Sequence, residues 1–335
     1  MPSAVAFYSK RALIIAGVLL ALLGINYLVN LVPTLGYYKH VLNNCGIAVI
    51  ATVSLNLVTG FTGQFSLGHA GFMAIGAYTS ASFVVFLGPF SPPLSMFLGM
   101  LTGGICAAIS GFIVGLPTLR LRGDYLAIAT LGFSEIIRVS ILNIQKVGGA
   151  RGFIGIPETA NIFWIWGAAI LTVVVIANLV YSPRGSAFLA IREDEIAAGA
   201  MGIQTTKYKV AAFVVSAFFA GMAGSLFAHH NAYLNPASFD FLKSVEVVLM
   251  VVLGGLGSIT GSVIAAVIVT ASLEVLRGFA EWRLVIYAVL LILMMIVRPQ
   301  GLFGSKELFS STDRRMLKGV WREREEEEEK EEIIT

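Results

Sequence analysis

The sequence predicts an all-α membrane protein, a polytopic bundle of about ten transmembrane helices. Of its 335 residues 57% are hydrophobic and only 13% are charged, whereas a typical soluble domain is about 25% charged. The mean hydropathy of +0.83 leaves too little polar surface to cover a water-soluble globule. The uncharged runs are also long: the first covers residues 12–32, enough to cross roughly 30 Å of hydrocarbon. We expect this run to be retained as the first helix.

The apolar runs are expected to be helices, because in lipid every backbone amide must be bonded within its own segment. A β-barrel would show stretches of roughly ten residues with alternating hydrophobicity, and these runs are longer and uniformly apolar. The predicted transmembrane helices cover residues 12–32, 41–57, 65–87, 94–116, 125–142, 162–180, 210–228, 241–256, 258–276 and 282–297.

The distribution of lysine and arginine predicts the orientation, because cytoplasmic loops carry the excess of basic residues. With both termini in the cytoplasm and ten crossings, 16 of the 23 basic residues lie on the cytoplasmic side. The loop at residues 182–209 is then cytoplasmic, and the loop at 229–240, which has no Lys or Arg, lies outside. An arrangement of eight or nine spans remains open if a short segment is re-entrant.

The chain divides into a membrane domain and a tail. Residues 1–304 form the predicted membrane domain, and residues 305–335 form a polar, acidic tail on the cytoplasmic side. Charge runs of this kind are typical of disordered or solvated segments. A tail that binds a partner is the alternative.

The loop at residues 182–209 contains a predicted short amphipathic helix with an apolar side and a charged cluster. The residues are Leu189, Ile196 and Ile203 on the apolar side and Arg192, Glu193, Asp194 and Glu195 in the cluster. Helices that lie on a lipid surface usually carry Lys and Arg. The acidic cluster therefore favours the other explanation, which is docking into a groove on a cytosolic protein.

Two glycine-interrupted regions, residues 58–71 and 252–261, lie between apolar runs. Broken helices in matching positions of two halves indicate the path of a transporter, whereas close helix packing on glycine is the simpler explanation. Both explanations stay open. The candidate path residues are Asn56, Gly60, Gly63, Gln64, Ser66, His69, Gly254 and Gly257.

Few ionisable residues lie within the predicted spans. Glu135 and Arg138 are three residues apart on one helix and can neutralise each other, so we expect a structural pair. Glu246, near a segment end, is the one carboxylate that is expected to be unpaired. The sequence contains neither a G-x-x-x-x-G-K-[ST] phosphate loop nor a hydrolase or metalloprotease motif. We therefore expect no ATP site, no catalytic residue and no metal site in this chain.

Five motifs, in order along residues 40–304, resemble those of branched-chain amino-acid ABC transporter permeases. The motifs are LNLVTGFTGQFSLGHAGF at 55–72, LRLRGDYLAIATLG at 119–132, IREDEIAA at 191–198, VLGGLGS at 252–258 and RPQGL at 298–302. The LRGDY and RPQG elements are similar to the LivM-type subunit rather than to its LivH-type partner.

The resemblance implies the ABC importer permease fold and a multi-pass protein of the inner or plasma membrane. It implies a transport subunit that is not an enzyme and binds no cofactor, since ATP is used by partner subunits. The implied partners are a LivH-type permease subunit, two cytosolic ATPase subunits, an extracytoplasmic substrate-binding protein, the lipid bilayer and an amino-acid substrate, with no nucleic acid. The implied cargo is leucine, isoleucine or valine, or a related amino acid or amide.

The loop helix would then be the coupling helix, seated in a groove on the ATPase. It departs from the corresponding loop of other importers, because Gly199 interrupts it and no Leu-Pro closes it. A secondary transporter driven by an ion gradient is the alternative function.

Overall fold

The computed structural model describes residues 36–87, 91–119, 121, 123–275 and 289. Its regular structure is helical, and the one pairing of extended chain in these ranges is an isolated bridge between Phe153 and Leu234. The longer helices are α2 (Gly36–Asn56), α3 (His69–Leu87), α4 (Pro92–Thr118), α5 (Asp124–Asn143), α6 (Ile162–Val180), α9 (Thr205–Asn231), α10 (Phe241–Gly254) and α11 (Ile259–Val275). The shorter ones are the π-helix η2 (Leu57–Phe61), the 3-10 helices η3 (Gln145–Val147), η4 (Gly149–Arg151) and η5 (Pro236–Phe239), and the α-helices α7 (Gly185–Glu193) and α8 (Glu195–Ala200).

Among the described residues, six helices are long and apolar enough to cross a membrane: α2 with η2, α3, α4, α5, α6 and α9. Each coincides with a predicted segment, and α2 with η2 and α9 extend beyond theirs at both ends. The predicted all-α polytopic bundle is therefore confirmed.

The predicted count of about ten spans is not confirmed. The segments predicted at 241–256 and 258–276 form α10 and α11, described over 14 and 17 residues. At 1.5 Å per residue α10 rises only about 21 Å, because the chain breaks at Gly254 and Gly255 before the hydrocarbon is crossed. The segments predicted at 12–32 and 282–297, apart from residue 289, and the tail at 305–335 lie outside the described residues.

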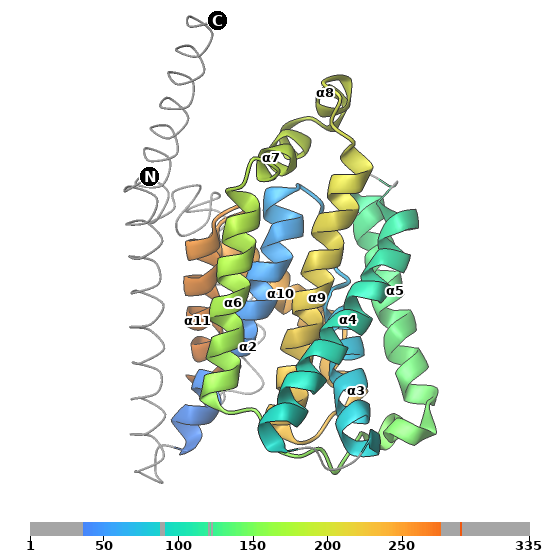
Figure 1. Cartoon of the computed structure of the whole chain (residues 1–335), viewed down its shortest axis with the longest axis vertical. Coiled ribbons are helices and arrows are strands. Elements are labelled where there is room, and N and C mark those ends of the chain that lie inside the picture. The colour runs from blue at the N-terminus through green and yellow to red at the C-terminus, as the bar shows by residue number, and fades with distance from the viewer. Residues whose placement is uncertain (1–35, 88–90, 120, 122, 276–288, 290–335) are drawn as a thin grey trace, which may run out of the picture.

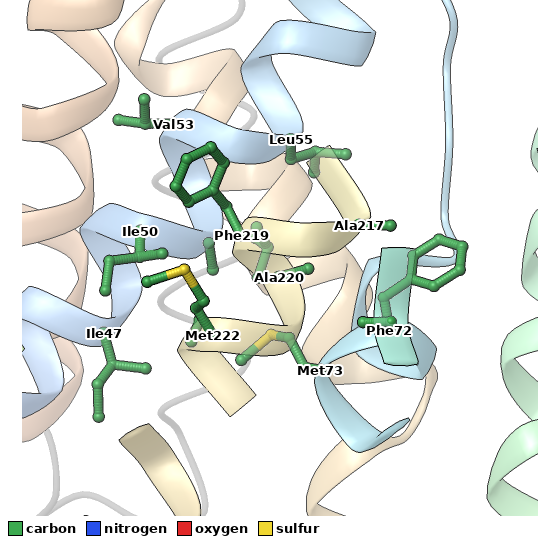
Figure 2. Packing of buried hydrophobic residues seen from close by; sticks show 14 of the residues in the cluster. Ile47, Ile50, Val53, Leu55, Phe72, Met73, Ala217, Phe219, Ala220 and Met222 are labelled. Carbon is green, nitrogen blue, oxygen red and sulfur yellow. The ribbon is translucent and has the colours of Figure 1, made fainter. Parts of the chain in front are cut away.

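Helix α9 lies at the centre of the bundle, where it packs against α2, α3 and α4 (Figure 1). Figure 2 shows part of the buried cluster, with Ile50 and Val53 on α2, Met73 on α3, and Phe219 and Met222 on α9. Lipid tails are as apolar as these side chains. Close packing, rather than transfer of the side chains out of water, therefore holds the helices together.

Glycines let these helices approach one another. A Cβ atom on Gly103 of α4 would lie 2.7 Å from the carbonyl oxygen of Gly76 on α3, and one on Gly221 of α9 would lie 2.6 Å from the carbonyl oxygen of Gly103. Both distances are too short for a larger residue. This is the close backbone approach that small residues permit between membrane helices.

The two ends of the bundle carry different elements (Figure 1). The short helices α7 and α8 lie at one end, between α6 and α9. The loops from α5 to α6 and from α9 to α10 lie at the opposite end, where the backbone N–H of Phe153 donates to the carbonyl oxygen of Leu234 (2.8 Å). The segments predicted to face opposite sides of the membrane, 182–209 and 229–240, thus lie at opposite ends.

Candidate functional site

The first predicted break lies between α2 and α3. The α-helix gives way to the π-helix η2, and residues 62–68 are not helical. Gly63 has a φ of +69°, a conformation that residues with a side chain rarely adopt. The backbone N–H of Gln64 donates to the carbonyl oxygen of Val58 (3.0 Å) and closes the turn. Because π-helical turns are frequent at functional sites, this break is a candidate site in itself.

The second predicted break lies between α10 and α11. Gly255 and Gly257 have φ values of 107° and 81°, and α11 begins at Ile259. The hydroxyl oxygen of Ser258 accepts a bond from the N–H of Gly261 (3.1 Å) in the first turn of α11. A Cβ atom on Gly254 would lie 2.6 Å from the carbonyl oxygen of Gly261. The glycines therefore fold α10 closely back onto α11.

Asn56 joins the two breaks. Its Nδ2 donates to the carbonyl oxygen of Ser258 and to Oγ of Ser262, both at 2.9 Å, and its Oδ1 accepts from the N–H of Gly257 at 3.0 Å. A Cβ atom on Gly60 would clash with the carboxamide of Asn56 and with the backbone nitrogen of Gly257. We refer to these five residues as the junction. The two glycine-interrupted regions, which the sequence related only by their similar pattern, are therefore in direct contact.

Arg192, at the end of α7, reaches the junction from the predicted coupling loop. Its Nη1 donates to the carbonyl oxygen of Gly60 (3.2 Å), and its Nη2 forms an ion pair with Glu193 (2.8 Å). A Cβ atom on Gly63 would lie 3.0 Å from Cγ of Arg192, and one on Gly257 would lie 2.9 Å from Nη1. The structure thus brings together a predicted coupling residue and predicted path residues, which the sequence treated separately.

The remaining path candidates lie along the first break. Nε2 of His69 is 3.1 Å from Oγ of Ser54, and Oγ of Ser66 accepts from the N–H of Gly68 (3.4 Å). The side chain of Gln64 is buried, and neither atom of its carboxamide has a hydrogen-bond partner among the described residues. A buried amide without partners is destabilising. Gln64 is therefore the path candidate whose buried polar atoms remain without a partner among the described residues.

The predicted coupling helix is wrong in one respect, because the structure has two short helices instead of one. Asp194 has extended backbone (φ −155°, ψ 112°) between α7 and α8, and its Oδ1 accepts from the N–H groups of Ile196 and Ala197. Asp194 is thus the N-cap of a new helix. The expected apolar side is therefore not continuous: Ile196 is 69% exposed and Leu189 is 37% exposed, whereas Ile203 follows the end of α8.

Other side chains hold α7 and α8 to the bundle. Phe188 and Ile191 are the large buried side chains of α7 in place of Leu189, together with the smaller residues Gly185 and Ala187. Glu195 forms an ion pair of 2.6 Å with Lys209 of α9, whose side chain is 7% exposed. Because burying an unpaired charge is costly, Glu195 holds α8 against α9. It is less available to an external partner than its place in the acidic cluster suggested.

Two ion pairs lie within single helices, one on α5 and one on α10. Glu135 and Arg138 form the predicted ion pair, at 2.7 Å. The expectation that Glu246 is unpaired is wrong, because its Oε2 lies 3.0 Å from Nζ of Lys243, one helical turn earlier. Among the residues that the structure describes, no group of three His, Cys, Asp or Glu side chains could hold a metal ion.

Sequence reasoning missed three residues that complete these contacts. They are Ser258 and Ser262 at the junction and Lys209 under α8. The two serines are four residues apart in an apolar run directly after a glycine break, a pattern that places both hydroxyl groups on one helix face. That pattern could have identified them.

A bundle of membrane-length helices, with two interrupted helices in contact and a pair of short helices at one end, defines a polytopic transport permease. The chain belongs to the family described as branched-chain amino acid transport system / permease component, whose model matches residues 37–297. The resemblance identified from the motifs is therefore confirmed.

Several members of this family are similar to the chain. The high-affinity branched-chain amino acid transport system permease protein LivM of Salmonella typhimurium is 39% identical over 291 residues, which cover 76% of this chain and 67% of that protein. The LivM protein of Escherichia coli is 38% identical over the same shares. The LivH permease protein of Salmonella typhimurium is 26% identical over 78% of this chain and 92% of its own length. No solved structure matches the chain.

Proposed function

We propose that this chain is the LivM-type permease subunit of an ATP-driven importer of leucine, isoleucine and valine. The relatives with 38–39% identity carry the LivM name and the description of branched-chain amino acid transport. A LivH-type permease subunit, two cytosolic ATPase subunits and an extracytoplasmic binding protein complete the importer. The end of the bundle with α7 and α8 faces the cytoplasm, where the ATPases hydrolyse ATP.

The bond between Arg192 and Gly60 is the observation that carries this proposal. It joins α7, on the end of the bundle, to the π-helical turn in the first break. Through Asn56 the same turn is bonded to the second break. Any displacement of α7 by an ATPase therefore acts on both interrupted helices at once.

An ion-driven secondary transporter is less well supported. A proton relay needs carboxylates that are not neutralised by a neighbouring cation. Glu135 and Glu246 each bond a basic side chain three residues away. The paired carboxylates therefore favour the ATP-driven function.

Reconstitution in proteoliposomes tests the proposed function. The complete complex should take up labelled leucine only when both ATP and the binding protein are present. Arg192→Gln should retain the bound ATPase and lower ATP-dependent uptake at least tenfold, because the shorter amide cannot make the bond to Gly60. Uptake that follows an ion gradient without ATP would support the secondary transporter instead.

A further inference from the structure

Helix α5 is a candidate span that the rest of the bundle buries poorly, and two charged residues lie near its middle. Among the six candidate spans it is the least buried, and Figure 1 shows it at the edge of the bundle. Glu135 and Arg138 lie roughly 2 Å and 7 Å from the midpoint of the helix, at 1.5 Å per residue. Their side chains are 35% and 28% exposed. Both therefore lie well inside the hydrocarbon depth.

The outward side of α5 forms one continuous stripe, which we refer to as the α5 face. Its members share one side of the helix, at spacings of three and four residues. They are Tyr125, Ile128, Gly132, Glu135, Ile136 and Val139. Glu135 lies near the middle of this stripe, so its half-buried carboxylate borders the exposed surface.

The α5 face differs from the other poorly covered helix faces. Helices α4 and α6 also expose large apolar side chains, among them Ile109 and Leu171, yet neither helix contains Asp, Glu, Lys or Arg. Those faces suit lipid. A charged side chain at the centre of a membrane helix costs about 2.5–3.5 kcal/mol on insertion scales, and such residues almost always face protein or a water-filled cavity.

The geometry of the ion pair also disfavours a lipid-facing position. An arginine in lipid extends toward the nearer membrane surface, which for Arg138 is the end of α5 at Asn143. Instead, Nε and Nη2 of Arg138 both bond Oε2 of Glu135, at 2.8 Å and 2.7 Å, back toward the midpoint of the helix. No bond to Oε1 of Glu135 or Nη1 of Arg138 is found among the described residues.

We infer that the α5 face is the surface on which the second permease subunit docks. This rests on the proposed function, which supplies a partner of the same family. Among the described residues, no other element has an atom within 4 Å of the Cβ position of Gly132, so a partner helix can approach closely there. The free Oε1 and Nη1 atoms offer an acceptor and a donor to that helix.

The opposite side of α5 links this interface to the first break. A Cβ atom on Gly68 would lie 2.8 Å from the carbonyl oxygen of Thr130, and one on Gly71 would lie 2.9 Å from Cα of Ser134. The hydroxyl oxygen of Thr130 also accepts from the N–H of Leu67 (3.1 Å). The docked subunit is thus separated from residues 62–71 by one helix.

Photo-crosslinking tests the inference. The chain is co-expressed with the epitope-tagged LivH-type subunit, the ATPases and a photoreactive amino acid at Ile136 on α5, or at Ile109 on α4 as the control. The two positions are 61% and 55% exposed. We expect an adduct with the tagged subunit from position 136 only. An equal adduct from 109, an adduct with a second copy of this chain, or lipid adducts alone from 136 would overturn the inference.

A pair of glycine variants gives a second readout. Gly132→Phe on α5 and Gly167→Phe on α6 both enter space that no other described residue fills, so both should insert normally. Gly132→Phe should lower the co-purified second subunit at least tenfold, and Gly167→Phe should leave it unchanged. If both variants retain equal amounts of the second subunit, the inference that the α5 face is the docking surface is wrong, while the proposed function is unaffected. If the unmodified chain also fails to bind the second subunit, the proposed function fails with it.

Discussion

Asn56 is the residue on which the two interrupted helices depend, because one fully buried carboxamide bonds three groups of the other break. The sequence could identify Asn56 as a candidate, since an asparagine in an apolar run needs partners. It could not identify Gly257, Ser258 and Ser262 as those partners, because they lie more than 200 positions away along the chain. Their contact is set by how α2 packs against α11.

Substituting Asn56 tests the junction. Asn56→Leu removes all three bonds and leaves the partly buried N–H of Gly257 without its acceptor, at a cost of about 1–3 kcal/mol. We expect normal insertion and at least a tenfold loss of leucine uptake, measured in membrane vesicles at matched protein levels.

Ser262→Ala is the control for this substitution, because Asn56 then keeps its bonds to Gly257 and Ser258. Uptake should stay within about a factor of two of the unmodified protein. Equal uptake in Asn56→Leu and Ser262→Ala would mean that the joint between the two breaks has no part in transport.

Helices α7 and α8 show what a local pattern can predict. The helical spacing of Leu189 and Ile196 indicated one amphipathic helix, although Asp194 followed by Glu195 is also a typical helix start, with an N-cap and an acid in the first turn. The structure follows the second pattern. The buried position of Lys209 depends on tertiary packing and had no signal in the loop sequence.

The exposed side of α8 predicts how an ATPase is held. Ile196 is 69% exposed, so Ile196→Asp should leave the permease folded and place a charge in the apolar contact with the ATPase. We expect the co-purified ATPase to fall at least tenfold. Ile154→Asp is the matched control, because Ile154 is 74% exposed in the loop from α5 to α6, which lies at the opposite end of the bundle.

Glu195→Lys is a less specific test of the same contact. It places a second cation beside the buried Lys209, and breaking a buried pair costs about 3–5 kcal/mol. We expect a lower yield of folded protein.

Loss of the ATPase from Ile154→Asp, or its full retention in Ile196→Asp, would exclude α8 as the docking element.

At the scale of the whole molecule, length and composition predicted the bundle well, since each predicted segment from 41 to 276 coincides with a described helix. The residues that end the helices were harder to predict. A π-helical turn keeps the apolar pattern of an α-helix, so nothing in residues 57–61 distinguishes η2 from a continuation of α2. The contact between the two glycine regions is a property of the assembled bundle, in which α2 packs between α9 and α11.

The orientation of the bundle is the prediction that belongs to this scale. Basic residues accumulate on the cytoplasmic side of membrane proteins, and the end with α7 and α8 carries Arg184, Arg192, Lys207 and Lys209, whereas residues 229–240 carry no Lys or Arg. We therefore expect α7 and α8 in the cytoplasm. Single cysteines at Met201, directly after α8, and at Ile154, in the loop from α5 to α6, report the two sides of the membrane. These positions are 84% and 74% exposed, and the two segments lie at opposite ends of the bundle.

The labelling uses a variant in which Cys45 and Cys106 are replaced by alanine and which still transports leucine. In right-side-out vesicles an impermeant thiol reagent should label Ile154→Cys at once and Met201→Cys only after the membrane is opened. The reverse pattern would place α7 and α8 outside. An ATPase in the cytoplasm could not reach Arg192 in that orientation, so the bond to Gly60 could not couple ATP hydrolysis to the two breaks.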